Sequence, residues 1–149
     1  MIIFYRKAFS MKVYELSDKD KELIEAALEM EKQNHDYGLH YRVVACALRC
    51  GNGEVYRGIN IGKIHNSCAE YVAFGAAISN GQREFDTIVA VHAEAKNNIV
   101  TPCGNCRQLM MEYCPDIFVI INDETGKPVK VRARELLPYA YEEIIINDC

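Results

Sequence analysis

Two short stretches decide the fold of this chain and its chemistry: Cys68-Ala69-Glu70 and Pro102-Cys103-Gly104-Asn105-Cys106. Together they supply three thiols and one nearby carboxylate. Zinc in a catalytic site takes three protein ligands and keeps a fourth position for water. The predicted ligands are Cys68, Cys103 and Cys106. Glu70 stands two residues after the first of them and can carry protons without binding the metal.

The first cysteine is predicted to stand at the start of a helix. Ser67 is a suitable N-cap, an apolar run follows over 72–78, and Gly81 ends the helix. The stretch from Ser67 to Glu70 also matches the capping box S-x-x-E, in which the glutamate only closes the helix end. Taken alone, Glu70 is best interpreted as such a cap. Beside three thiols, the catalytic interpretation is preferred.

The other two cysteines are predicted at the start of a second helix. Thr101 is its expected N-cap, Pro102 takes the favoured first position, and the helix runs to about Tyr113. The two cysteines are three residues apart and share one helix face. A strand over 87–91 lies between the two helices. A helix–strand–helix path brings both helix N-termini to the same end of a sheet, where backbone N–H groups and helix dipoles favour thiolates.

Three other interpretations compete with a catalytic zinc site. A Cys-x-x-Cys pair can be a redox pair, but this explains neither the third cysteine nor the glutamate. A structural zinc site lacks a second Cys-x-x-Cys here, although a fourth thiolate could come from Cys46, Cys50, Cys114 or Cys149. His92-Ala93-Glu94 repeats the pattern with histidine, but it ends a strand and no helical run follows. We expect His92 to lie near the site without binding the metal.

The remaining pattern predicts an α/β fold. An acidic first turn after Ser17, followed by apolar residues at helical spacing, predicts an N-terminal helix. Strands are expected over 40–48, 55–61, 117–121 and 128–131, with a hairpin turn at Asn52-Gly53 and a short helix over 133–137. The link between the last two strands is too short for a parallel crossover, so they should be antiparallel. We predict a three-layer α/β/α fold with a mixed five-stranded sheet.

Composition narrows the class of protein. A chain of 149 residues can form one domain with its own core, so we expect a single domain over 1–149, with 1–10 as a possible N-terminal extension. The net charge of −4 and the scattered basic residues give no footprint for nucleic acid. No apolar run is long enough to cross a membrane. Seven cysteines, an odd number with three assigned to zinc, indicate reduced thiols and a cytoplasmic protein.

From about Leu16 to Tyr141 the chain resembles the small cytidine deaminases, and its closest branch there looks like the blasticidin-S deaminases. Three cysteines with a separate glutamate and a P-C-x-x-C motif form the pattern of zinc deaminases. The matching strings are Tyr41-Arg42-Val43, Gly58-Ile59-Asn60, Cys68-Ala69-Glu70, Pro102-Cys103-Gly104-Asn105-Cys106-Arg107-Gln108 and Glu135-Leu136-Leu137-Pro138. The resemblance implies a Zn²⁺ cofactor, hydrolytic removal of an amino group from the cytosine ring of a small nucleoside-like substrate, and a homotetramer whose sites border neighbouring subunits.

The resemblance also suggests residues around the substrate. Tyr41 can border the pyrimidine ring, and Tyr141 matches an aromatic residue of the pocket in the blasticidin-S branch. Asn60 begins the Asn-x-Glu pattern of the nucleoside deaminases. Arg107 is the local candidate to offset the negative charge of a three-thiolate zinc site. For each of them an ordinary core or surface role is the alternative, which for Arg107 is a solvated surface charge.

The chain departs from the family pattern where the substrate is held. The glutamate of Asn-x-Glu holds the ribose in related enzymes, but Gly62 stands in its place, and the loop that follows is short. Tyr71 occupies a position that is usually arginine. Blasticidin-S deaminases share these losses but differ at Asn105 and Arg42, so substrate contact by these two residues stays open. We predict a blasticidin-S-type deaminase, with an ordinary cytidine or deoxycytidine deaminase of pyrimidine salvage, or a non-catalytic zinc module, as alternatives.

Overall fold

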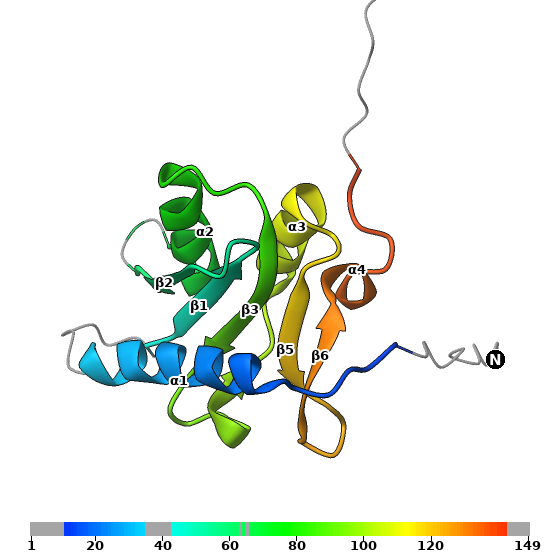
Figure 1. Cartoon of the computed structure of the whole chain (residues 1–149), viewed down its shortest axis with the longest axis horizontal. Coiled ribbons are helices and arrows are strands. Elements are labelled where there is room, and N and C mark those ends of the chain that lie inside the picture. Colours follow the sequence, from blue (N-terminus) through cyan, green and yellow to red (C-terminus); the bar gives the residue numbers. More distant parts are fainter. Residues whose placement is uncertain (1–10, 35–42, 63, 65, 143–149) are drawn as a thin grey trace, which may run out of the picture.

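The computed structural model describes residues 11–34, 43–62, 64 and 66–142, and these residues form a sheet with helices on both faces (Figure 1). The helices are α1 (Asp18–Gln33), α2 (Ala69–Ser79), the 3₁₀ turn η1 (Lys96–Asn98), α3 (Gly104–Tyr113) and α4 (Ala133–Leu136). The strands are β1 (Ala45–Cys50), β2 (Val55–Ile59), β3 (Phe85–Val91), β4 (Ile99–Val100), β5 (Phe118–Asn122) and β6 (Pro128–Arg132).

The sheet is mixed, as the sequence predicted. Its order is β2-β1-β3-β5-β6, in which β3 and β5 are parallel and the other neighbours are antiparallel. The short β5–β6 link therefore makes the predicted antiparallel pair. The five predicted strands are present, together with a sixth, β4, that pairs with the end of β3 through Ala90 and Val100. Two residues are too few for a recognisable pattern, which is why β4 was not predicted.

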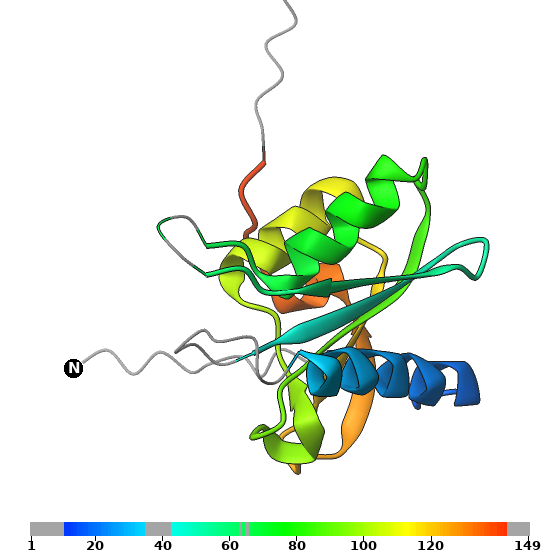
Figure 2. The same ribbon diagram turned by 90° about the vertical axis from the view of Figure 1, so that its left-hand side faces the viewer.

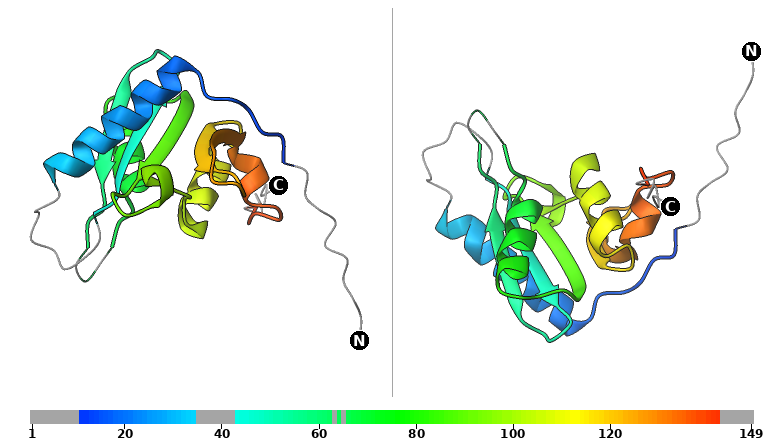
Figure 3. Two further views of the ribbon diagram at one scale, coloured as in Figure 1. Left: turned by 90° about the horizontal axis from the view of Figure 1, so that it is seen from below. Right: turned by 90° about the horizontal axis from the view of Figure 1, so that it is seen from above.

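The predicted three layers are present (Figure 2). Side chains alternate along the strands and so contribute to two separate cores, one on each face of the sheet. On β1, Ala45 and Ala47 face α1, where they pack with Leu23 and Ala27. Cys46 and Leu48 of the same strand face the opposite way. There they pack against α2, α3 and α4, which share the second face of the sheet. On the first face, α1 lies over β1 and β3 (Figure 3).

A buried ion cluster holds α1 on its face of the sheet. Asp20 is fully buried, and its carboxylate lies 2.7 Å from Arg49 of β1 and 2.6 Å from Lys130 of β6. The same carboxylate accepts hydrogen bonds from the N–H and hydroxyl of Ser17, the predicted helix start. Burial alone would raise the pKa of Asp20, but the bonds from Lys130, Arg49 and Ser17 outweigh burial and hold the pKa well below 3.8.

Several strand limits differ from prediction by a few residues. The strand expected over 40–48 is β1, which ends two residues later than predicted, while 40–42 lies outside the described residues. The next strand ends at Ile59 rather than at residue 61. The turn between them is as predicted, since Gly53 has a φ of +90° and its N–H donates to the carbonyl of Cys50. Within the described chain, no helix is long and apolar enough to cross a membrane.

Gly58 of β2 allows α2 to lie directly on the sheet. A Cβ atom at this position would stand 2.3 Å from the carbonyl oxygen of Ala69 and 2.4 Å from the backbone nitrogen of Ala73. Both are atoms of the α2 backbone, which cannot move aside as a flexible side chain can. The absence of a side chain at Gly58 therefore sets the position of the first turn of α2, which follows Cys68 directly.

We expect Gly58→Ala to destabilise the fold by about 1–3 kcal/mol, toward the upper end because the clash is with backbone. The displaced α2 should also weaken zinc binding. Gly75→Ala is the matched control, because Gly75 is an exposed residue of the same helix with no atom within 4 Å of an added Cβ. This control should gain roughly 0.5–1 kcal/mol. Denaturant unfolding of both variants measures the difference, and equal stabilities would contradict the close-packing argument.

Candidate active site

Both helices that carry the cysteines begin later than predicted. Cys68 is the N-cap of α2 and Cys103 is the N-cap of α3, each with an extended backbone. The predictions that Ser67 and Thr101 are the caps, and that Pro102 opens the second helix, are therefore wrong. Ser67 is instead paired with Ile61 through two backbone hydrogen bonds of 2.9 Å.

The later start of α2 decides between the two interpretations of Glu70. A capping box joins the N-cap residue to the third helical residue. With Cys68 as N-cap, that third residue is Tyr71, and Glu70 is the second. No capping hydrogen bond from a side chain is present at this helix start. The capping interpretation of Glu70 is therefore wrong, and its carboxylate is left for another role.

The structure brings the three predicted ligand residues together. The Sγ atoms of Cys68 and Cys103 lie 3.7 Å apart, and those of Cys103 and Cys106 lie 3.6 Å apart. All three sulfur atoms are within 4.8 Å of one another, and within the described part of the chain no other group of three metal-binding side chains is as close. Cys106 is buried, Cys68 is half-buried and Cys103 is exposed. The cluster is thus open on one side.

The electrostatics of the cluster call for a cation. Burial, with the negative charges of Glu70 and the neighbouring thiols, raises the pKa of Cys106 far above 9.0, and burial also raises that of Cys68. The pKa of Cys103 is lowered, since hydrogen bonding from Cys106, Cys68 and the backbone of Asn105 outweighs the effect of burial. Three thiolates this close repel one another, and a bound metal ion is the usual means of holding them ionised.

The donor set fits zinc. Zinc–sulfur bonds are about 2.3 Å long, so two sulfur atoms on a tetrahedral zinc are about 3.8 Å apart. The two sulfur–sulfur distances in the cluster, 3.7 and 3.6 Å, already match this spacing. Three protein ligands beside an open face are the arrangement of a catalytic rather than a structural zinc site. Four cysteines are named above as possible fourth ligands of a structural site. Cys46, Cys50 and Cys114 lie outside the cluster, and Cys149 lies outside the described residues.

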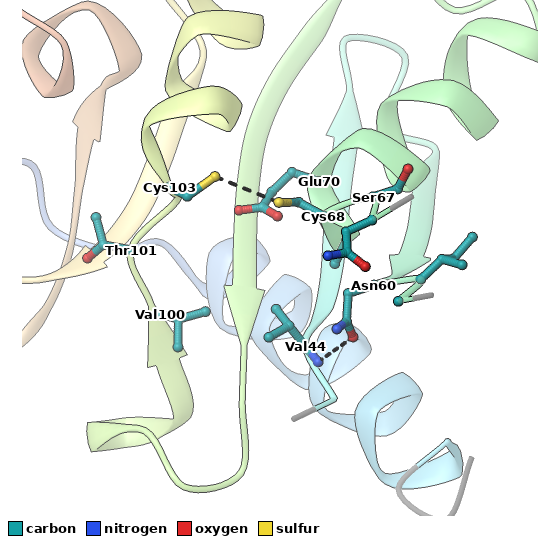
Figure 4. A pocket seen from close by; sticks show the side chains of 12 residues that line it. Val44, Asn60, Ser67, Cys68, Glu70, Val100, Thr101 and Cys103 are labelled. Atoms are coloured by element: carbon teal, nitrogen blue, oxygen red, sulfur yellow. Dashed lines mark hydrogen bonds between the residues drawn. The ribbon is translucent and has the colours of Figure 1, made fainter. Parts of the chain in front are cut away.

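Glu70 stands next to the thiols without being part of their cluster. Its side chain is almost completely buried, and burial raises its pKa above 4.5, although hydrogen bonds from Cys106 and from its own backbone act in the opposite direction. In Figure 4 its carboxylate points toward the sulfur of Cys68. A buried carboxylate whose pKa is raised can both accept and donate a proton in general acid–base catalysis.

A pocket of about 380 Å³ opens beside these groups. One wall comes from the end of β2 and the loop before α2, and the facing wall from the end of β4 (Figure 4). Glu70 is the only carboxylate among the described residues that line the pocket. These lining residues are Val44, Asn60, Ile61, Gly62, Asn66, Ser67, Cys68, Ala69, Glu70, Val100, Thr101 and Cys103.

The predicted substrate residues have different outcomes. Asn60 lines the pocket, and its Oδ1 accepts a hydrogen bond from the N–H of Val44 at 2.8 Å. Tyr41 and Arg42 lie outside the described residues. Tyr141 does not line the pocket in the single chain: its side chain is 71% exposed, and its backbone is bonded to Gln108 of α3. Asn105 is also absent from the lining.

Arg107 is not a solvated surface charge. Its side chain is half-buried, and it donates hydrogen bonds to the carbonyls of Pro102, at 2.8 Å, and Leu136, at 3.1 Å. These bonds tie the start of α3 to α4. Whether its charge also offsets that of the thiolates stays a prediction.

His92 is expected near the site, but it neither lines the pocket nor belongs to the metal cluster. It follows the end of β3, and the chain then returns to the pocket through η1 and β4.

Sequence reasoning missed part of the pocket wall. Val100 and Thr101 belong to or follow the unpredicted strand β4, and Asn66 and Ser67 belong to the loop before α2. The one available signal was Pro102, because a residue before proline is biased toward extended backbone. That bias favours a strand end at Thr101 over the predicted helix cap.

Comparison with known families decides the identity of this fold and site. The family model for the cytidine and deoxycytidylate deaminase zinc-binding region matches residues 17–122. The chain belongs to the cytidine deaminase family. It is a zinc-dependent hydrolase of that family, with Zn²⁺ as its cofactor and a three-cysteine metal site.

Individual relatives agree with this assignment. The deaminase is 39% identical to the blasticidin-S deaminase of Bacillus cereus over 141 residues, which covers 88% of this chain and 98% of the relative. It is 38% identical to the cytidine deaminase of Halalkalibacterium halodurans, over 70% of this chain and 81% of that one. Its structure is similar to that of cytidine deaminase from Burkholderia pseudomallei, with a TM-score of 0.66 and 30% identity over 81% of this chain and 98% of the other.

We expect the purified deaminase to contain one zinc ion per chain, because three thiols at tetrahedral spacing bind zinc tightly. Cys103→Ser should lose most of the zinc, since a serine hydroxyl is a weak ligand for this metal. Cys114→Ala is the control: Cys114 is a half-buried free cysteine outside the cluster. Elemental analysis of the three proteins measures the content. Full zinc in Cys103→Ser, or a zinc-bound structure with Cys46 or His92 as ligand, would contradict the assignment.

Proposed function

We propose that the deaminase hydrolyses the amino group of a cytosine ring in a nucleoside-like substrate with an altered sugar, of the blasticidin-S type, releasing ammonia. The observation that carries this proposal is the pocket itself. A buried glutamate and an open three-thiol metal site lie together at the pocket, and its described lining residues include no second carboxylate that could hold a ribose. The extent of similarity to the Bacillus cereus blasticidin-S deaminase, across nearly the whole of both chains, supports the same substrate class.

The roles of the residues follow from their chemistry. Cys68, Cys103 and Cys106 would hold the zinc, which when bound would lower the pKa of a water molecule to about 7. Glu70 takes a proton from the attacking water and passes it to the ring nitrogen. The water oxygen adds to C4 of the ring. Glu70 then takes the remaining proton of that oxygen and gives it to the departing amine, which leaves as ammonia while the C4 carbonyl forms. One water is consumed and one ammonia released, so Glu70 ends the cycle as it began.

The polar groups of the pocket orient the substrate in this proposal. Asn60 is held by its bond to Val44 and presents a fixed amide at the pocket wall. Tyr41 remains a proposed contact of the ring, and Tyr141 a proposed contact from a neighbouring subunit in a homotetramer, since it is too exposed to act within its own chain. The proposal includes a cytoplasmic location and no nucleic-acid partner, in keeping with a small-molecule substrate and a net charge of −4.

An ordinary cytidine deaminase is the second candidate function. It is favoured by the 38% identity to the cytidine deaminase of Halalkalibacterium halodurans. It is disfavoured by Gly62, which lines the pocket at the position where the family pattern has the ribose-binding glutamate. A non-catalytic zinc module is disfavoured more strongly. Such a site needs four protein ligands, and the described residues bring only three together.

Glu70→Gln should fold, bind zinc and lose activity. Glutamine keeps the shape of the side chain but cannot transfer a proton, and proton transfer by a positioned group contributes about 10²–10⁴-fold to rate. We therefore expect kcat to fall at least about a hundredfold. Steady-state kinetics, with zinc content measured on the same sample, test this. A variant that keeps its zinc and more than about a hundredth of wild-type kcat would show that Glu70 is not the proton carrier.

Blasticidin S should be deaminated more efficiently than cytidine. A ribose hydroxyl with no partner at Gly62 leaves about 1–3 kcal/mol of desolvation uncompensated. This corresponds to roughly tenfold to a hundredfold in kcat/KM. Ammonia release from the two substrates, measured side by side, tests the order. A cytidine kcat/KM equal to or above that for blasticidin S would instead establish the ordinary salvage activity.

Gly62→Glu tests whether the substrate preference of the same protein can be shifted toward cytidine. It restores the carboxylate of the family pattern, so the ratio of the two kcat/KM values should move toward cytidine. Gly62→Gln is the matched control, since it adds a side chain of the same length without the charge. If both variants shift the ratio equally, the side chain acts by bulk and not by binding the sugar.

A further inference from the structure

A hydrogen bond joins the two helices that carry the metal cluster. The hydroxyl of Tyr71 donates to Oδ1 of Asn105 over 3.1 Å. Tyr71 is in the first turn of α2 and follows Glu70 directly, whereas Asn105 is in the first turn of α3, between Cys103 and Cys106. The bond therefore connects the segment that holds one thiol and the proton carrier to the segment that holds the other two thiols. The two helices lie beside each other on the same face of the sheet (Figure 2).

Neither residue belongs to the pocket of the single chain. Both are missing from the described residues that line the pocket, although the lining includes their sequence neighbours Glu70 and Cys103. The bond thus lies beside the metal cluster and outside the described lining of the pocket. The sequence left open whether Asn105 contacts the substrate. Its position outside the pocket lining does not favour such a contact. A role in fixing the positions of the groups around the metal suits the geometry better.

The first turn of α3 needs such an anchor. It contains Gly104, which is exposed, and glycine has greater backbone freedom than any other residue. Arg107 fixes this turn on one side through the carbonyls of Pro102 and Leu136, toward α4. Asn105 fixes it on the other side, toward α2. The ring of Tyr71 packs against the buried core, so its hydroxyl is offered to Asn105 from a side chain that is already held in place.

We propose that Tyr71 and Asn105 form a positioning pair that holds the Cys103–Cys106 turn at a fixed place relative to Cys68 and Glu70. The proposal rests on the function proposed above for the metal site and names residues that set its geometry. Partners that orient metal ligands from outside the coordination sphere commonly affect metal affinity or activity by about 10–100-fold when they are removed. Here the partner acts through the backbone of the ligand turn, since Asn105 lies between two ligands in sequence.

The experiment compares Tyr71→Phe, Asn105→Ala and the double variant with the wild-type zinc-loaded protein. The first readout is the rate of zinc release to a chromogenic chelator, measured without substrate. Each single variant should release zinc about tenfold faster. The double variant should be no faster than the more affected single variant, because both changes remove the same bond. Tyr113→Phe is the matched control: it makes the same chemical change at an exposed tyrosine at the far end of α3 and should leave the release rate unchanged.

A second readout separates positioning from general stability. The rise in Tm on zinc binding should shrink in Tyr71→Phe, while the Tm of the zinc-free protein changes little. Wild-type release rates in both single variants, or additive effects in the double variant, would overturn the proposal. So would equal losses of Tm with and without zinc, because these would mark an ordinary packing contact. All of these readouts are independent of substrate, so they distinguish failure of the positioning pair from failure of the proposed activity.

Discussion

Three sulfur atoms from two separate segments must lie within 4.8 Å of one another, and much of the architecture serves this requirement. One sulfur is at the start of α2 and two are at the start of α3, with β3, η1 and β4 between them in the chain. β3 carries the chain back along the sheet from the end of α2, and β4 returns it to the level where α3 begins. The sheet therefore fixes where each helix starts. Three thiolates repel one another, and their attraction to a bound metal ion would hold them together.

The two faces of the sheet differ in how their charged groups are paired. The face under α1 is closed by an apolar core and by the Asp20 cluster, where one buried carboxylate is matched by Arg49 and Lys130. Because every charge in this cluster has a partner at hydrogen-bond distance, burial is tolerated. The other face carries the thiols and Glu70, and the described residues give these groups no ion pair that would balance their negative charges once the thiols are ionised. Such an excess of negative charge is typical of a functional site, and a bound divalent cation would neutralise part of it.

The described wall of the pocket has few charged side chains. Beyond Glu70 and the metal-binding Cys68 and Cys103, its described lining is neutral, with amide and hydroxyl groups among apolar residues; the polar lining residues are Asn60, Asn66, Ser67 and Thr101. Such a wall is suited to an aromatic ring and neutral polar groups, in agreement with the proposed nucleoside-like substrate. In the proposed function, the metal site and Glu70 supply the family chemistry, while Gly62 contributes to the choice of substrate.

The sequence by itself determined the local structure and the chemistry of the site. Alternating and continuous apolar runs identified the major strands, the Asn52-Gly53 turn identified the hairpin, and the short β5–β6 link required an antiparallel pair. The spacing of three cysteines and one glutamate identified the metal and its family, because ligand number and residue type are properties of the sequence. These features depend on residues close together in the chain or on the chemistry of single side chains.

Only the tertiary structure decided how these parts meet. The two-residue strand β4 exists because β3 offers it a partner, and its own sequence carries no pattern. Cys68 and Cys103, rather than Ser67 and Thr101, begin the helices, since paired and extended backbone precedes each cysteine. The contact of Gly58 with α2 and the bond from Tyr71 to Asn105 join residues distant in sequence. Such contacts arise from packing in three dimensions, which a one-dimensional pattern does not encode.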